Sequence, residues 1–150
     1  MADAVEVAIE SALLNRLNAL VFAPVIPVAQ PNVTLNPAPV AGPGVRYLEA
    51  TFLPAKSFAM GIAYNAHNQY YGILQVSVRG PLNEGDLVPR RIAAAVAGTN
   101  GWFKRGTQVT KDGFTATIYD VPDVPQGRID DPWWMIPVSI PYRCFARPTV

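Results

Sequence analysis

The sequence predicts an α+β domain, with a mostly antiparallel or mixed sheet of four to five strands and two helices packed on one face of it. Two stretches place apolar residues at helical spacing, and the stretches between and after them alternate apolar with polar residues, as half-buried strands do. The predicted order is helix, a short first strand, two strands, helix, two strands. A chain of 150 residues has the length of one domain, so residues 1–150 are assigned to a single domain.

The first helix begins close to the N-terminus. Asp3, followed three residues later by Glu6, has the spacing of a capping box at a helix start. Pro24 would stop the helix after Phe22, because proline cannot continue a helix. The apolar stripe of this helix consists of Val5, Ile9, Ala12, Leu13, Leu17 and Leu20.

Strands and a second helix follow. Residues 24–44 are rich in proline and contain one short apolar piece, VIPVA, that would be a first strand. A helix starts at Asp86, which would cap it, and ends at Gly98. Its buried stripe would be Val88, Ile92, Ala95 and Val96. Three further stretches alternate, namely 45–53 with Leu48, Ala50 and Phe52 on one face, 70–80 with Leu74, Val76 and Val78, and 113–122 with Phe114, Ala116 and Ile118.

Residues 54–69 have neither a helix period nor a strand period, and they separate two strong strands. We expect a long loop or an extended hairpin tip there, and long loops in compact domains are usually functional or disordered. Four of its side chains are too apolar for a simple solvated loop: Phe58, Met60, Ile62 and Tyr64. The segment therefore fits an arm that docks on a partner.

The last strand, WWMIPVSIPYRC at residues 133–144, contains Pro137 and Pro141, which cannot donate a backbone hydrogen bond. Backbone N–H groups alternate in direction along a strand, so both missing donors lie on one side. We therefore expect an edge strand whose open edge is blocked against β-addition, and we expect that replacing both prolines with valine or threonine promotes aggregation.

The two tryptophans that begin this strand point to opposite faces. Trp134 shares its face with the apolar residues Ile136, Val138, Ile140 and Tyr142, so Trp133 is the exposed one. An exposed tryptophan is a frequent anchor at protein interfaces. Covering a helix end or a loop is an equally good interpretation of Trp133.

The composition points to a subunit of an assembly. Charged residues make up 15% of the chain, below the roughly 25% usual for a soluble domain. The net charge of +1 argues against a nucleic-acid binder that neutralises many phosphates. Cys144 is the only cysteine, which excludes an intramolecular disulfide and a zinc site built from several thiolates. The sequence holds no apolar run long enough to span a bilayer, and its acidic N-terminus does not resemble a signal peptide.

Residues that could carry chemistry are few. His67 is the only histidine and has no ligand cluster near it in sequence, and Cys144 at the end of an apolar strand is best explained as a small buried side chain. Asp130 and Asp131 are interpreted as a solvated turn rather than a cation site. Lys104 and Arg105 form, with Lys111, Trp102 and Phe103, a basic and aromatic surface cluster for which anion contact is the less favoured alternative. We predict no catalytic, cofactor-binding or metal-binding residues.

Several stretches in order, YYGILQVSVRGPLNEG, WFKRGT, GFTATIYDVP and WWMIPVSIPYR, resemble the tail terminator proteins of long-tailed bacteriophages and prophages. LNALVFAPVIPVAQPNV and VRYLEATFLPA fit the same pattern, so the resemblance spans nearly the whole chain. It implies a virion protein, assembled in the bacterial cytoplasm, that forms a hexameric ring at the head-proximal end of the tail. The ring would stop polymerisation of the tail tube protein and present a surface to head completion proteins. DNA would pass through its lumen without sequence-specific binding, and no enzymatic activity or cofactor is implied.

The predicted interface consists of the arm at Ala55–Gln69, Trp133, and the turn at Lys104 and Arg105. Two other classes of protein remain open. One is another neck component, such as a head completion, adaptor or stopper protein. The other is a small-ligand-binding or enzyme domain in which the apolar loop covers a pocket.

Overall fold

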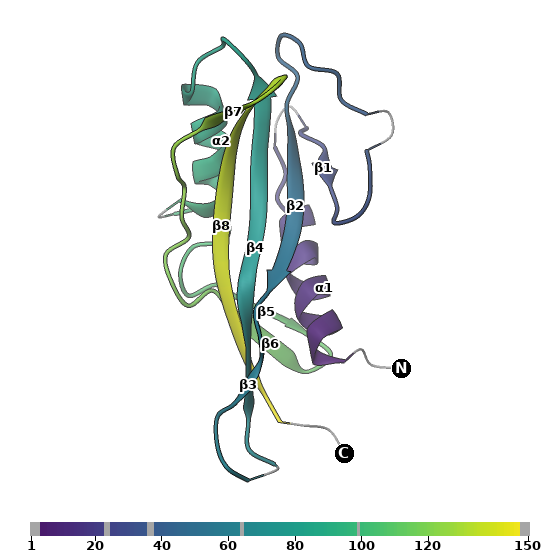
Figure 1. Ribbon diagram of the computed structural model, residues 1–150, viewed down its shortest axis with the longest axis vertical. Helices are drawn as coiled ribbons and strands as arrows, with labels where there is room; N and C mark the ends of the chain where they lie inside the picture. The colour runs from purple at the N-terminus through teal and green to yellow at the C-terminus, as the bar shows by residue number, and fades with distance from the viewer. Residues whose placement is uncertain (1–3, 23–24, 36–37, 64, 99, 148–150) are drawn as a thin grey trace.

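The computed structural model describes residues 4–22, 25–35, 38–63, 65–98 and 100–147 (Figure 1). Two helices and eight strands form in these residues. In chain order they are α1 (Val5–Asn18), β1 (Val28–Ala29), β2 (Tyr47–Pro54), β3 (Phe58–Ala59), β4 (Asn68–Pro81), α2 (Leu87–Ala97), β5 (Gln108–Lys111), β6 (Phe114–Thr117), β7 (Arg128–Asp130) and β8 (Trp133–Ala146).

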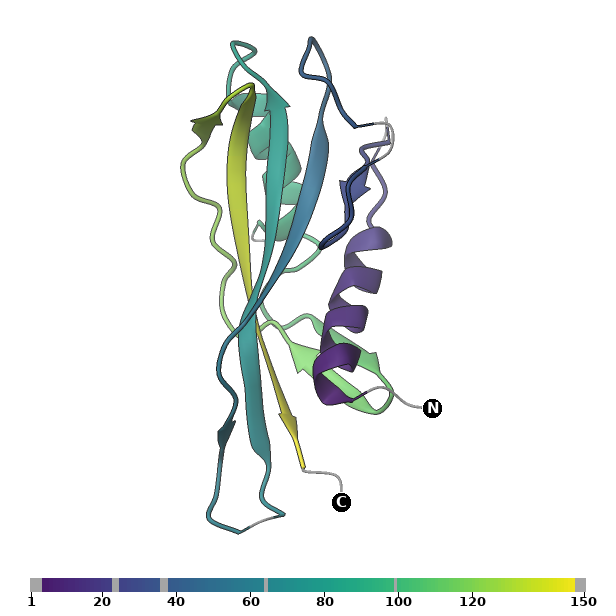
Figure 2. The ribbon, with the colours of Figure 1, turned by 45° about the vertical axis from the view of Figure 1, so that its right-hand side comes forward.

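The strands form one mixed sheet in the order β1-β2-β4-β8-β6-β5, with β3 paired to β4 and β7 paired to β8. β1 runs parallel to β2, and every other pair is antiparallel. The sheet curls into a half-barrel, as Figure 2 shows from the side. The predicted α+β class is confirmed, whereas the predicted number of four to five strands is wrong.

The strands that the sequence did not predict, β3, β5 and β7, are short, and they form because neighbouring strands pair with them. β3 and β7 have two and three residues and exist because they lie against β4 and β8. β5 joins β6 through a turn at Asp112 and Gly113, both of which have positive φ (53° and 82°). Asp-Gly is a favoured pair for a two-residue hairpin turn, so this signal was present in the sequence.

One hydrophobic core lies between the sheet and both helices. α1 packs over β5 and β6, and α2 packs over β4 and β8. The expected apolar faces of the long strands are confirmed, because the same alternate residues are buried in the structure. They are Leu48 and Ala50 in β2, Leu74, Val76 and Val78 in β4, and Ile136, Val138, Ile140 and Tyr142 in β8.

The helices differ in detail from the prediction. α1 buries Ile9, Leu13 and Leu17 as expected but ends at Asn18 rather than near Phe22, and Asp3 and Pro24 lie outside the described residues. α2 ends at Gly98 as expected. Of its predicted stripe, Ile92 and Val96 are buried, whereas Val88 and Ala95 are exposed. The buried set is Pro89, Ile92, Ala93, Val96 and Ala97.

β8 is not an edge strand. All 14 of its residues pair with β4, and β6, β7 and a bridge from Asp123 lie on its other side. The argument from N–H direction holds, because Ser139, midway between Pro137 and Pro141, donates its N–H to the Asp123 carbonyl (3.0 Å), away from β4. The segment between β6 and β7 therefore covers the proline side of β8, with few backbone hydrogen bonds to it. Because this side is covered, the reason for expecting aggregation when both prolines are replaced no longer holds.

Candidate assembly surface

The arm consists of residues 55–67, which join β2 to β4 and extend past the rest of the fold at one end of the molecule (Figure 1). β3 pairs with the start of β4, and the N–H of Met60 donates to the carbonyl of His67 (2.9 Å). The start of β4 also pairs with the end of β8, from Asn68 with Ala146 onward. Backbone ladders thus hold the base of the arm on both sides.

Apolar side chains on the arm face solvent. Phe58 and Met60 are about half exposed, and Ile62 has an exposed fraction of 107%, which means that it touches almost nothing. The Phe58 ring lies edge-on to Tyr71, with 5.8 Å between ring centroids. Tyr64, the fourth predicted residue, lies outside the described residues. The structure thus supplies an exposed apolar arm, whose docking stays a prediction.

The base of the arm depends on Gly72, where β2, β4 and β8 come close together. A Cβ at this position would lie 2.6 Å from the Leu53 carbonyl oxygen, 2.7 Å from the Tyr142 hydroxyl and 2.8 Å from Pro54 Cα. Two of these neighbours are backbone atoms, which do not move aside easily. Only glycine fits here without a shift of the strands.

We expect Gly72→Ala to lower the free energy of unfolding by about 1–3 kcal/mol, because overpacking forces the backbone apart. Urea denaturation measures this loss. Gly80→Ala in the same strand is the matched control, since its Cβ would meet nothing closer than Pro89 Cγ at 3.5 Å. Equal stability of the two variants would contradict the close approach at Gly72.

The sheet face opposite the helices carries apolar residues and the exposed Arg143 towards the arm, and charged residues at the other end. Near the arm, exposed Leu53 lies opposite Ile73, which lies opposite Pro141. At the other end, β7 overhangs the sheet and forms an open groove of about 430 Å³, whose lining includes Arg79, Glu49 and Asp130. This face is therefore not a uniform surface.

Arg79 organises the charged end. Its guanidinium donates to the Asp130 carboxylate and lies 3.7 Å from a Glu49 oxygen. The hydrogen bond from Arg79 lowers the pKa of Asp130. This ion pair links β7 to β4, so Asp130 is not part of a purely solvated turn. Arg79 and Asp130 are 51 residues apart, and nothing in the local pattern reveals their contact.

Trp133 is buried, with 8% of its surface exposed, so its predicted exposure is wrong. Its ring lies edge-on to Tyr47 of β2 at 5.1 Å, and this neighbour covers it on the face away from the helices. Trp134 is half-buried on the other face and donates Nε1–H to Asp86 Oδ1 (2.8 Å). That carboxylate also accepts from Arg90 Nε (2.7 Å), so Asp86 stands at the N-cap position without capping the helix through its side chain.

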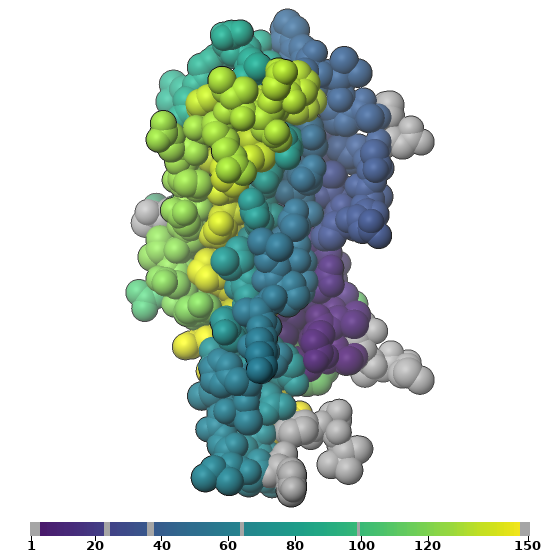
Figure 3. Space-filling model, in the orientation of Figure 1, coloured from purple at the N-terminus to yellow at the C-terminus, as the bar shows by residue number. Residues whose placement is uncertain are grey.

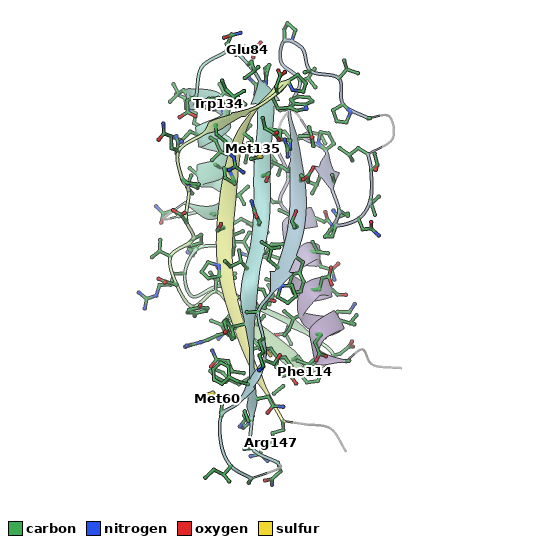
Figure 4. All side chains as sticks on the ribbon, viewed as in Figure 1. Met60, Glu84, Phe114, Trp134, Met135 and Arg147 are labelled. Atoms are coloured by element: carbon green, nitrogen blue, oxygen red, sulfur yellow. The ribbon has the colours of Figure 1, made fainter. Side chains whose placement is uncertain are left out.

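The hydrogen bonds from Arg90 and then Trp134 lower the pKa of Asp86. Asp86 and Trp134 thus join the start of α2 to β8 at the end of the molecule opposite the arm, and Figure 4 shows Trp134 there with Glu84, far from Met60. Trp133 pairs with Pro81, 13 ladder steps from the pair at Asn68. At about 3.4 Å per residue, Trp133 lies about 44 Å from the arm along the sheet. The structure does not bring these predicted residues together.

Lys104 and Arg105 are exposed in the turn after α2. Their neighbours are not part of a surface cluster, because Phe103 is fully buried and Trp102 is fixed to α1. Arg16 Nη2 donates to the Trp102 carbonyl (2.9 Å), and Trp102 Nε1 donates to the Arg16 carbonyl (2.6 Å). The Arg16 guanidinium also stacks 4.0 Å from the Trp102 ring centroid. Sequence reasoning missed this contact, which holds the turn in place.

Groups able to carry chemistry are dispersed. Within the described residues, no group of three or more His, Cys, Asp and Glu side chains is placed to hold a metal ion. His67 is exposed on the arm, and Cys144 is buried, which raises the pKa of its thiol. Among the residues that the structure describes, no helix is both long and apolar enough to cross a membrane.

Comparisons with known proteins agree with this architecture. One solved protein structure matches with a TM-score of 0.69 and 26% sequence identity, covering 97% of this chain and 96% of that one. No curated protein matches the sequence. The family model described as phage tail terminator protein matches residues 8–142, which include nearly all of both helices and of the sheet. The chain therefore belongs to the phage tail terminator family.

Proposed function

We propose that this protein ends the tail tube of a long-tailed bacteriophage or a related particle. Copies of the chain, six by the resemblance of the sequence, form a ring at the head-proximal end of the tube. The ring stops polymerisation of the tube protein and offers the surface on which head completion proteins join head to tail. DNA passes through its lumen without sequence-specific contact, and the protein carries out no catalytic step.

The observation that carries this proposal is the family match over residues 8–142. Two physical features support it. The chain has few charges for a soluble domain, 15% of its residues. It also exposes large apolar side chains on the arm, and exposed apolar surface of this kind marks sites of protein association. Both features suit a subunit that neighbours cover.

Deleting the gene from the producing virus and imaging the particles by negative stain tests the proposal. We expect tails of uncontrolled length that are detached from filled heads, and normal particles when the gene is supplied in trans. Tails of normal length that fail to join heads would move the protein to a head-side adaptor or stopper. Normal infectious particles would overturn the proposal and return attention to a ligand-binding role.

A second measurement addresses the ring itself. Light scattering of the purified protein, alone and with tube protein, gives the mass of the assembly. Six copies of the 16.2 kDa chain would have a mass of about 97 kDa. If the protein keeps the mass of one chain both alone and in the presence of tube protein, ring formation is contradicted.

A further inference from the structure

Two long stretches of the chain carry no Asp, Glu, Lys or Arg. One is residues 17–45, between Arg16 and Arg46, and the other is residues 57–78, between Lys56 and Arg79. At the 15% of charged residues in this chain, a stretch as long as the first would hold about four charges. Chance alone is a poor explanation for two such stretches in one chain with both signs of charge elsewhere.

The first stretch covers one side of the molecule. It includes residues 19–45, which we call the connector. The connector contains β1 and runs beside β2 (blue in Figure 3). The described connector exposes four valines, Val21, Val25, Val33 and Val40, each at least 60% exposed. A solvated connector would normally carry charges and small polar residues, whereas this one presents valine and proline to solvent.

The second stretch contains the arm except for Ala55 and Lys56 at its base. The exposed apolar residues Phe58, Met60 and Ile62 lie on it, at the end of the molecule that the connector does not reach (Figures 1 and 3). One subunit therefore has two uncharged apolar surfaces in different places. Its own arm does not cover its own connector.

We propose that the arm of one copy packs on the connector of the next copy. The inference rests on the proposed ring and names the surfaces that close it. A contact between two unlike surfaces of the same chain is heterologous, and repetition of such a contact closes a ring. Both surfaces hold few charges, Lys56 at the base of the arm and Glu49 at the hollow, so packing them together avoids most of the cost of removing ions from water.

A second copy of the chain fits better than a different partner, because the number of arms then equals the number of connectors. Each added copy brings one arm and one connector, so a closed ring covers every surface of both kinds. A tube protein or a head-side protein bound to the arm would leave the valines of the connector exposed. The proposal therefore accounts for both uncharged stretches with one contact.

The connector side has room for arm side chains. An open hollow of about 350 Å³ lies between residues 29–34 of the connector and residues 49–52 of β2. Its lining residues include Val33, Phe52 and one charged residue, Glu49 of β2. Ile62, at the tip of the arm, is free to enter such a hollow because it has almost no contacts within its own chain.

A charge exchange between the two surfaces tests the pairing. Val33→Lys and Ile62→Asp are made singly and together, and light scattering measures the mass of each assembly in the presence of tube protein. We expect Ile62→Asp to lose the ring, since it would bring a carboxylate into a hollow that Glu49 also lines, and Val33→Lys to weaken the ring, since it replaces an apolar contact with a charged side chain. The double variant should regain it, because each contact then places the lysine of one copy beside the aspartate of the next.

The matched control is Val121→Lys. Val121 is 62% exposed, close to the 60% of Val33, and lies outside both the arm and the connector. This variant should keep the ring of the unaltered protein. Thermal unfolding of all variants should show little change, since substitutions at exposed positions seldom alter stability by more than about 0.5 kcal/mol.

A cysteine exchange gives a readout that does not depend on charge. In a Cys144→Ser background, chains carrying Val33→Cys and chains carrying Ile62→Cys are mixed and oxidised. We expect disulfide-linked pairs of the two kinds of chain, and none when Arg91→Cys, on an exposed position of α2, replaces Val33→Cys. Links between two Ile62→Cys chains alone would overturn the proposal.

Other results separate this inference from the proposed function. If the single variants still form rings that stop tube growth, the function stands and the pairing of arm with connector is wrong. If the double variant stays at the mass of one chain, the pairing is also wrong. If the unaltered protein forms no ring on tubes, both the ring and its contacts are wrong.

Discussion

Replacing Phe103 with alanine is expected to lower the free energy of unfolding by about 3–5 kcal/mol, as removal of a buried aromatic side chain usually does. Phe103 is fully buried in the core, and its N–H donates to the Val96 carbonyl (2.8 Å). The variant therefore opens a cavity beneath α2 and loosens the turn that follows it. Urea or thermal denaturation measures the loss.

The next two residues supply the control for Phe103. Lys104→Ala and Arg105→Ala change exposed side chains in the same turn and should shift stability by no more than about 0.5 kcal/mol. If Phe103→Ala were as mild as these two variants, the turn would not be anchored in the core. If either basic residue proved essential for stability, it would have contacts within the chain beyond those seen here.

Tyr142→Ala is expected to have an effect of similar size, about 3–5 kcal/mol. Tyr142 is 2% exposed, belongs to the central strand β8, and stacks on Phe52 with 5.3 Å between ring centroids. Its loss leaves a cavity between the sheet and α1 near the base of the arm. Tyr142→Phe keeps the ring and should be close to the unaltered protein at neutral pH.

At alkaline pH the same hydroxyl should make the protein less stable. Burial, and then the charge of Glu10, raises the pKa of Tyr142 above its ordinary value of 10.0. The unfolded chain therefore loses this proton first, so the stability is full below pH 10 and falls as the pH rises further. The slope from one such group is about 1.4 kcal/mol per pH unit.

Tyr142→Phe should make this alkaline decline shallower by about that amount. Burial also raises the pKa of Tyr47 and of Cys144, so some decline remains in the variant. Urea denaturation of both proteins at a series of pH values between 8 and 11 provides the comparison. Identical pH dependence would mean that the Tyr142 hydroxyl is exposed to solvent in the folded protein.

Residue patterns predicted the parts of the fold that depend on local periodicity. Alternation in 45–53 and 70–80 indicated the buried faces of β2 and β4, because one face of a strand packs on the core whichever strand lies beside it. The same alternation identified the buried residues of β8. Proline positions correctly showed which side of β8 lacks donors, but not which segments cover that side.

The predicted interface shows the limits of such patterns. Apolar residues in a segment without period indicated an exposed arm, and the structure exposes Phe58, Met60 and Ile62. Strand parity also placed Trp133 on the face away from the helices, but Tyr47, 86 positions earlier in the chain, covers it there. Exposure depends on neighbours distant in sequence, so parity alone could not predict it.

The sequence by itself thus determined the α+β class, the apolar faces of the long strands and the phage tail terminator family, because these follow from local spacing and from the order of strand cores and turns. Only the tertiary structure decided the order of the strands, the central place of β8 and the ion pair of Arg79 with Asp130. It also decided that the uncharged connector and the arm lie on different parts of the surface. Each of these depends on which distant segments the folded backbone brings together, and no local pattern contains that information.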